Sequence, residues 1–516
     1  MVFQPPQGLP GWTAAGGCAH VVQGIESPRL LPAQGGGYFV GVFRRSPTIV
    51  LLAWLCGLLM SQVAPSPFPA GKIIPKVVCS ADSRQSYALY LPSTFSATRK
   101  WPIIYLFDPL ARGEVAVEAV RVAAEKFGYI VVASNNSRNG PMADSTAAAN
   151  AVWHHTQERF PVEEQRRYLA GMSGGARLVT AIALSCDGCA AGVIANAAGF
   201  PIGKSPQRNM KFAYFGAVGN ADFNYGEFVD LRKNLEDAGA QYRIRIFEGQ
   251  HGWAPPAVWL EALNWIDIRA MAAGSLPRDP ARIQQTADEE LARARNLQAK
   301  NNLLAAARQY QSLVRDFKGL TDVSAGESSL AELAKNKGVK AEEKQEASAL
   351  EQQARISEPF AEQMQSIASG DSDNVDVNAL KHEFADLKKR ADSTPNSDDL
   401  KALVVRRAMG GLVIAAYESG QHSMEGKDYR AALAYFDLAA TGSGNPAFAH
   451  YQRARAYAML GNRKGTLAEL RRALAAGFHD ESALNAGEFQ SFQELAEFQT
   501  LAADWKAEAE KERGNP

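Results

Sequence analysis

The segment Gly171-Met172-Ser173-Gly174-Gly175 places a serine between glycines, where an apolar run ends and a helix-like run begins. Glycines let a strand turn tightly into a helix, and such a turn holds the serine hydroxyl above the edge of a sheet. The positive end of the helix dipole would stabilise an oxyanion that develops beside it. The pattern predicts a nucleophilic serine, whereas the alternative is an incidental serine in a glycine-rich turn.

A serine hydroxyl is a poor nucleophile at neutral pH and needs a base within hydrogen-bond reach. One histidine, His251, lies between Ser173 and the end of the strand-and-helix region, and it follows the strand-like run 242–247. His154 and His155 precede the serine as neighbours on a predicted helix, where packing and contact with solvent account for them. We therefore predict that His251 is the general base and then the general acid.

The histidine needs a carboxylate to fix its tautomer and to stabilise its protonated form. The aspartates between the serine and the histidine are Asp187, Asp222, Asp230 and Asp237. Asp222 directly follows the carboxyl end of the strand-like run 212–218, which makes it the preferred acid. Asp187 lies in a turn between cysteines, and the two later aspartates lie on a charged helix. Glu227 and Glu248 remain as alternatives.

The G-x-S-x-G turn and the chain order Ser173, Asp222, His251 resemble the α/β-hydrolase superfamily. The similarity is to its feruloyl-esterase, polyhydroxybutyrate-depolymerase and esterase D types in particular. It implies a serine hydrolase that cleaves carboxylic esters through an acyl-enzyme, with a small-molecule ester as substrate. It implies neither a metal nor an organic cofactor.

The same resemblance suggests where the oxyanion would be bound. One N–H donor is expected from Gly174, the residue after the nucleophile. The second should follow the strand-like run 103–107, where relatives usually carry a His-Gly pair but this chain reads Asp-Pro-Leu. Proline has no N–H, so Leu110 is the predicted donor. Asp108 then resembles the Leu-Asp-Gly variant of some relatives and is expected near the substrate.

The segment 134–140 follows the next strand-like run and is expected to line the substrate cleft. Asn135 and Asn136 are its predicted substrate contacts. Asparagine side chains also cap loops by hydrogen bonding to nearby backbone, so a purely structural role stays open.

These residues need a sheet to position them, and residues 72–272 alternate short β-branched or aromatic runs with helix-length segments. That alternation predicts an α/β-hydrolase fold, a mostly parallel sheet with helices on both faces. The predicted strands are 87–91, 103–107, 129–134, 168–172, 191–197, 212–218 and 242–247, and helices are expected over 115–127 and 228–239.

The composition changes after a predicted linker at 273–285, and residues 286–512 are expected to be all helical. The segments 427–442 and 462–477 superpose at a shift of about 34 residues, which resembles the tetratricopeptide repeat. The repeat is clearest over 411–477. A plain antiparallel helical bundle is the alternative, and either arrangement offers a face for a protein partner.

Residues 1–64 are predicted to be a leader, in which the apolar run 48–60 follows Arg44 and Arg45. About 13 apolar residues are too few to span a bilayer as a helix, so a signal peptide cleaved near Ala64 is expected. The two alternatives are an uncleaved anchor, which would be the predicted contact with a membrane, and a buried helix. The protein is thus predicted to be secreted or periplasmic.

Cleavage near Ala64 would leave three cysteines, Cys79, Cys186 and Cys189. The last two can pair locally, or one of them can pair with Cys79; either way one thiol is left over. No second pair of ligands stands at zinc-site spacing, so no metal is predicted.

The charge is balanced, with 55 Lys plus Arg and 55 Asp plus Glu, which gives no indication of a nucleic-acid partner. Two rival functions remain. One is a serine peptidase, although the chain has no β-propeller-like region ahead of residue 72. The other is a hydrolase scaffold that has lost catalysis and binds partners through its repeats.

Overall fold

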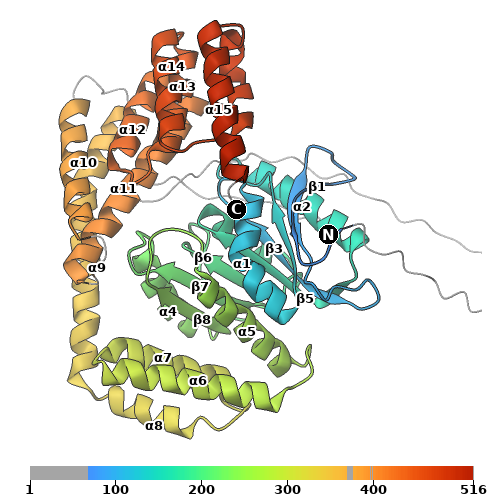
Figure 1. Ribbon diagram of the computed structural model, residues 1–516. Coiled ribbons are helices and arrows are strands. Elements are labelled where there is room, and N and C mark those ends of the chain that lie inside the picture. Colours follow the sequence, from blue (N-terminus) through green and yellow to red (C-terminus); the bar gives the residue numbers. More distant parts are fainter. Residues whose placement is uncertain (1–67, 369–375, 395–396, 398, 515–516) are drawn as a thin grey trace, which may run out of the picture.

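The computed structural model describes residues 68–368, 376–394, 397 and 399–514. Figure 1 shows a sheet covered by helices, followed in the chain by a large region made of helices. The apolar run 48–60 and the predicted cleavage point near Ala64 lie outside the described residues. Among the described residues, no helix combines the length and the apolar character needed to cross a membrane.

The first part is built on one eight-stranded sheet with the order β1-β2-β4-β3-β5-β6-β7-β8. Strand β2 runs antiparallel to both of its neighbours, and all other pairs are parallel. The strands are β1 (Ile73–Val78), β2 (Ser86–Tyr90), β3 (Trp101–Phe107), β4 (Ile130–Ser134), β5 (Val162–Met172), β6 (Gly192–Asn196), β7 (Ala213–Gly219) and β8 (Tyr242–Phe247).

Helices cover both faces of this sheet, because parallel strands must be buried on both sides. One apolar core packs the sheet against α2, α3 and α4, and a second packs the opposite face against α1 and α5. The helices are α1 (Gly113–Phe127), α2 (Met142–Arg159), α3 (Gly174–Ser185), α4 (Tyr225–Asp237) and α5 (Pro256–Ala273). The predicted α/β-hydrolase fold class is confirmed.

The predicted strands are all present, with two differences. Strand β5 begins at Val162, six residues before the predicted start at 168. The prediction missed its first residues because several of them are charged and partly exposed, so they lack an apolar pattern. Strand β1 was not predicted; it lies at the edge of the sheet, includes Pro75 and is largely exposed.

The second part consists of helices that pack against one another. They are α6 (Pro280–Ala299), α7 (Leu303–Phe317), α8 (Ser324–Leu333), α9 (Lys337–Ala368), α10 (Val377–Asp392), α11 (Leu400–Glu425), α12 (Tyr429–Gly442), α13 (Ala447–Met459), α14 (Arg463–Ala475) and α15 (Ala496–Gly514), with the short 3-10 helices η2 (Glu481–Asn485) and η3 (Gly487–Phe492). Helix α6 begins inside the segment predicted as a linker.

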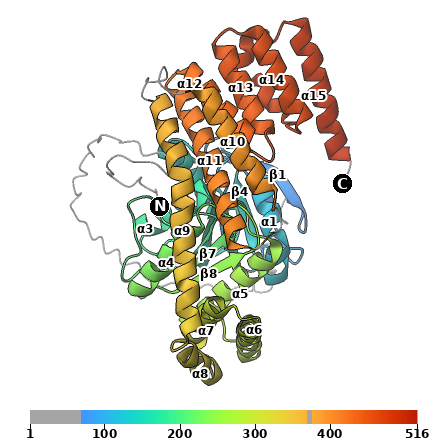
Figure 2. The same ribbon diagram turned by 90° about the vertical axis from the view of Figure 1, so that its left-hand side faces the viewer.

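Helices α12 and α14 begin at Tyr429 and Arg463, which are 34 residues apart, as the sequence period requires. Each packs against the helix before it, α11 and α13 respectively. Two successive helix pairs therefore follow each other at the predicted spacing, while the assignment to the tetratricopeptide family stays a prediction. Figures 1 and 2 show α9 running along the side of the sheet domain, with α6–α8 at one end and α10–α15 at the other.

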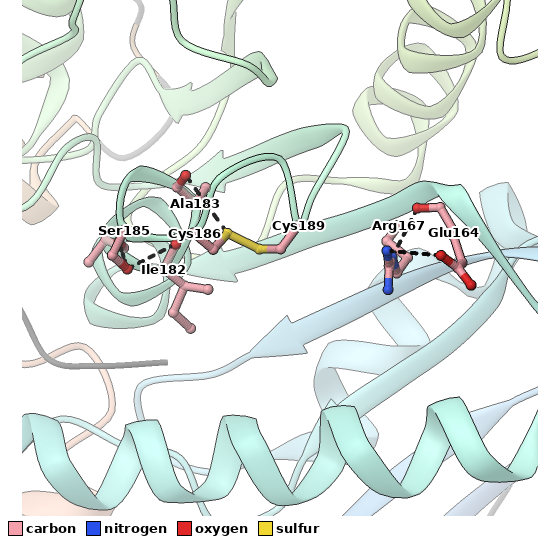
Figure 3. Close-up of a disulfide and its surroundings, with 8 residues drawn as sticks. Glu164, Arg167, Ile182, Ala183, Ser185, Cys186 and Cys189 are labelled. Carbon is pink, nitrogen blue, oxygen red and sulfur yellow. Dashed lines mark hydrogen bonds and ion pairs between the residues drawn. A yellow bond between two sulfur atoms is a disulfide. The ribbon is translucent and has the colours of Figure 1, made fainter. Parts of the chain in front are cut away.

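Cys186 and Cys189 form a local disulfide, and Cys79 is a buried free cysteine. Figure 3 shows the disulfide closing the turn that leads from the end of α3 toward β6. Burial, with a smaller effect from Asp82, raises the pKa of the Cys79 thiol to about 11. Of the cysteine pairings that the sequence left open, the structure has the local one, between Cys186 and Cys189.

Candidate active site

Ser173 lies in the one-residue turn between β5, which ends at Met172, and α3, which begins at Gly174. Its backbone has φ 54° and ψ −122°, a conformation that residues other than glycine rarely adopt. The side chain makes no capping hydrogen bond with the helix that it precedes. The backbone strain is thus concentrated at the residue predicted to be the nucleophile.

The glycines around the serine are required by the close approach of the backbone. A Cβ atom at Gly175 would lie 1.9 Å from the carbonyl oxygen of Phe107, and one at Gly171 would lie 2.3 Å from the carbonyl carbon of Gly175. Both clashes are with backbone atoms, which cannot swing aside as a side chain does. The prediction that small residues permit the tight turn is confirmed.

Asp222 and His251 are brought together from the loops that follow β7 and β8. The Nδ1 atom of His251 lies 3.0 and 3.1 Å from the two carboxylate oxygens of Asp222. The Asp222 side chain is fully buried, and that of His251 is 16% exposed. Because a carboxylate only accepts hydrogen bonds, Nδ1 carries a proton. In neutral His251, the unprotonated nitrogen is therefore Nε2, the atom that a general base uses.

The three loops meet because β5, β7 and β8 are parallel and end at the same edge of the sheet. Asn196, at the end of β6 between them, links two of the loops. Its carbonyl oxygen accepts a hydrogen bond from the N–H of Ser173 at 2.8 Å, and its side-chain oxygen accepts one from the N–H of Ala254 at 3.3 Å. Sequence analysis missed Asn196, although it is a single polar residue in an otherwise apolar strand.

The other acids weighed from the sequence lie elsewhere. Glu227 forms a two-pronged ion pair with Arg177 at 2.8 and 2.9 Å. The remaining acidic alternatives to Asp222 have exposed side chains: Asp187, Asp230, Asp237 and Glu248. Among the alternatives for the base, His154 is exposed and His155 is buried with its Nδ1 3.0 Å from the Tyr87 hydroxyl. The interpretation of these two histidines as packing and solvent contacts is confirmed.

The two predicted oxyanion donors differ in their surroundings. Gly174 is the first residue of α3, so its N–H has no acceptor within the helix. The N–H of Leu110 instead donates to the Asp108 carboxylate at 2.8 Å. Leu110 would have to exchange that partner for the oxyanion, and its role as a donor stays a prediction.

Asp108, predicted near the substrate, is buried and surrounded by protein donors. Its carboxylate accepts two hydrogen bonds from the Arg112 guanidinium and one from the indole N–H of Trp253, each at 2.9 Å. Together with the Leu110 N–H, these donors occupy both oxygens. The side chain therefore orders the loop after β3, and the structure provides no support for a direct contact with substrate.

Asn135 and Asn136 also use their side chains within the protein. The Asn135 amide donates to the carbonyl oxygen of Pro75 at 3.0 Å. Asn136 accepts from the N–H of Ser86 at 2.8 Å and donates to the carbonyl oxygen of Arg84 at 3.0 Å. Both act as loop caps, the alternative that the sequence left open.

A third asparagine of the same segment, Asn139, does reach the nucleophile turn. A Cβ atom added at Gly174 would lie 1.8 Å from the Asn139 side-chain oxygen, so that side chain lies directly over the start of α3. On the other side, the ring of Phe223 packs on His251 with 4.4 Å between ring centroids. These two residues, which sequence analysis did not single out, border the candidate site. Substrate contact through Asn135 or Asn136 stays a prediction.

Comparison with known proteins gives structural likeness only: no family model and no curated protein matches the chain. Among solved structures, S-formylglutathione hydrolase (FrmB) from Staphylococcus aureus is 14% identical, with a TM-score of 0.31, over 39% of this chain and 98% of that chain. A ferulic acid esterase is 17% identical over 38% and 96%, and Thermogutta terrifontis esterase 2 phosphorylated by paraoxon is 15% identical over 40% and 96%, each with a TM-score of 0.31. The chemistry must therefore be argued from the site itself.

Proposed function

We propose that this protein is a serine hydrolase that cleaves carboxylic esters. In this proposal the Ser173 hydroxyl loses its proton to Nε2 of His251 as the oxygen attacks the ester carbonyl. The protonated imidazole then passes the proton to the departing alcohol, which leaves an acyl-enzyme. Water activated by His251 attacks the acyl-enzyme and releases the acid.

The observation that carries the proposal is the buried Asp222–His251 pair at the sheet edge where Ser173 stands in a strained turn. A buried carboxylate that holds Nδ1 fixes the tautomer and favours the imidazolium that forms during attack. The N-terminal end of α3 adds positive potential beside the developing oxyanion. Neither step needs a metal or an organic cofactor.

One observation favours a second function, a hydrolase scaffold that binds partners but no longer catalyses. The Leu110 N–H is engaged by the Asp108 carboxylate, and that carboxylate is itself an anion near the place where an oxyanion would form. In that case the helical region would provide the function by binding a protein partner.

A fluorophosphonate probe separates the two, because it reacts only with an activated serine. We expect it to label the wild-type chain and to fail with Ser173→Ala. Ser185→Ala is the matched control, since Ser185 lies at the exposed end of the same helix and should leave labelling unchanged. A wild-type chain that folds but is never labelled would establish the scaffold instead.

We also propose that the protein is exported to a secreted or periplasmic location. The Cys186–Cys189 disulfide supports this proposal, because stable disulfides occur mainly in oxidising compartments. The apolar run 48–60 supports it independently as a signal peptide.

A further inference from the structure

The helical region returns to the sheet domain at the loop that carries the catalytic acid. The amide of Gln353 on α9 donates to the carbonyl oxygen of Phe223 at 3.1 Å. Arg407 on α11 donates to the carbonyl oxygen of Asn220 at 2.6 Å. Figure 2 shows α9 and α11 lying across this side of the sheet domain. The loop from 220 to 225 is thus held by residues of α9 and α11 that come 130 and 187 residues after their partners in the chain.

One stripe of α11 faces the candidate site. A Cβ atom at Gly411 would lie 3.2 Å from the Phe223 side chain, so this face of α11 contacts the residue that packs on His251. Glu418 follows seven residues later, which is about two helical turns and returns to the same face. Its carboxylate lies 3.5 Å from the side-chain nitrogen of Asn139, which covers the start of α3.

Within the described part of the chain, the Glu418 carboxylate makes no direct ion pair with a basic side chain. Arg177 is close enough for its charge to act on Glu418, but its guanidinium is occupied by Glu227 and by the carbonyl oxygen of Phe200. Burial raises the pKa of the Glu418 carboxyl, an effect that the charge of Arg177 only partly offsets. A partly desolvated carboxylate is stabilised by a positive charge that a ligand supplies, because opposite charges attract more strongly where water is scarce.

We propose that Glu418, from the helical region, is a substrate-recognition residue that binds a cationic nitrogen in the ester cleaved by Ser173. The helical region then forms one wall of the active site and selects among esters by charge. This inference rests on the proposed esterase function and adds the class of substrate to it.

Two thioesters of nearly equal shape test the charge preference in the full chain. Acetylthiocholine carries a quaternary nitrogen, and 3,3-dimethylbutyl thioacetate has a neutral carbon in its place; both release a thiol that is easily measured. We expect the ratio of their kcat/KM values to favour the cation in the wild type. Glu418→Gln, which keeps the shape and removes the charge, should lower that ratio by about tenfold.

Glu425→Gln is the matched control, since Glu425 is an exposed carboxylate on the same helix and the ratio should not change. Equal ratios in the wild type and in Glu418→Gln would overturn the role of Glu418. A chain that the fluorophosphonate probe labels but that does not turn over the cationic ester would overturn it as well. Absence of labelling would instead refute the esterase function, and this inference with it.

Discussion

At the scale of single residues, the site depends on which atoms hold which protons. The Asp222 carboxylate accepts a hydrogen bond from the Nδ1–H of His251 at 3.0 Å and another from the backbone N–H of Asn224 at 2.8 Å. The second bond fixes the carboxylate, and the first fixes the imidazole. In the proposed mechanism, catalysis by Ser173 therefore depends on Asp222, which does not touch the ester and acts by positioning His251 and by its charge.

Asp222→Asn tests that dependence with little change in shape. An amide in this place can present its NH2 group to Nδ1, which favours the tautomer that is protonated on Nε2 and cannot accept the serine proton. We expect kcat for p-nitrophenyl acetate to fall by about 10³- to 10⁴-fold. Asp230→Asn, at an exposed position on α4, should retain wild-type turnover. A similar rate in both variants would exclude Asp222 from the mechanism.

At the scale of elements, the loop from 220 to 225, which carries Asp222, is stabilised from outside the sheet domain. Phe223 packs between His251 on one side and Gly411 of α11 on the other. Glycine at 411 leaves room for the ring, whereas the neighbouring position 410 is less restricted, since a Cβ there would lie 4.0 Å from the ring. The position of His251 is thus coupled to the approach of a distant helix.

Gly411→Leu should push Phe223 toward His251 and disturb the imidazole. We expect kcat/KM for p-nitrophenyl acetate to fall by about tenfold or more, because small displacements of a catalytic group are costly. Gly410→Ala should stay close to wild type in the same assay. Thermal unfolding of both variants would show whether the loss of activity comes from a local change at His251 or from a less stable fold. Unchanged activity in Gly411→Leu would show that α11 does not control the histidine.

At the scale of the whole molecule, ion pairs join the helices to the sheet domain. Arg243 on β8 is buried and bonds to Glu290 of α6 at 2.9 Å and to Asp316 of α7 at 2.8 Å. A second contact centres on Glu346 of α9, which accepts from the Tyr225 hydroxyl at 2.5 Å and from the Arg308 guanidinium. The helical region is therefore joined to the sheet domain through charged groups that water scarcely reaches.

The contact at Glu346 should be sensitive to acid. Burial by itself raises the pKa of the Glu346 carboxyl, but the bonds and charge of Arg308 together with the Tyr225 hydroxyl lower it overall. A carboxyl with a lowered pKa in the folded state stabilises the fold above its unfolded pKa of about 4.3, and this stability is lost as the pH falls through the folded pKa.

Thermal unfolding of wild type and Glu346→Gln across pH 7 to 3 measures this contribution. We expect the variant to be less stable at pH 7, by about 1–3 kcal/mol, and the difference to close as the pH falls below about 4.3. Glu351→Gln, at an exposed position on α9, should follow the wild type throughout. A difference that does not depend on pH would exclude the ion pair as the cause.

The sequence by itself determined the fold class and the choice of Ser173, Asp222 and His251 as candidates. Period-two and apolar runs specify buried strands, and glycines at 171 and 175 specify a turn that only such small residues permit. These signals are local, so they can be read without knowledge of the rest of the chain. Strand β1 escaped prediction because an exposed edge strand with a proline lacks that local pattern.

Only the tertiary structure decided which polar side chains border the site. Asp108, Asn135 and Asn136 stand at suitable points in the sequence, yet each bonds to a residue that becomes its neighbour only on folding. These partners are Trp253, Pro75 and Ser86 respectively. Glu418 lies 245 residues after Ser173, and no local pattern connects the two. Contacts between distant segments depend on how complete elements pack, and that information is spread over the whole chain.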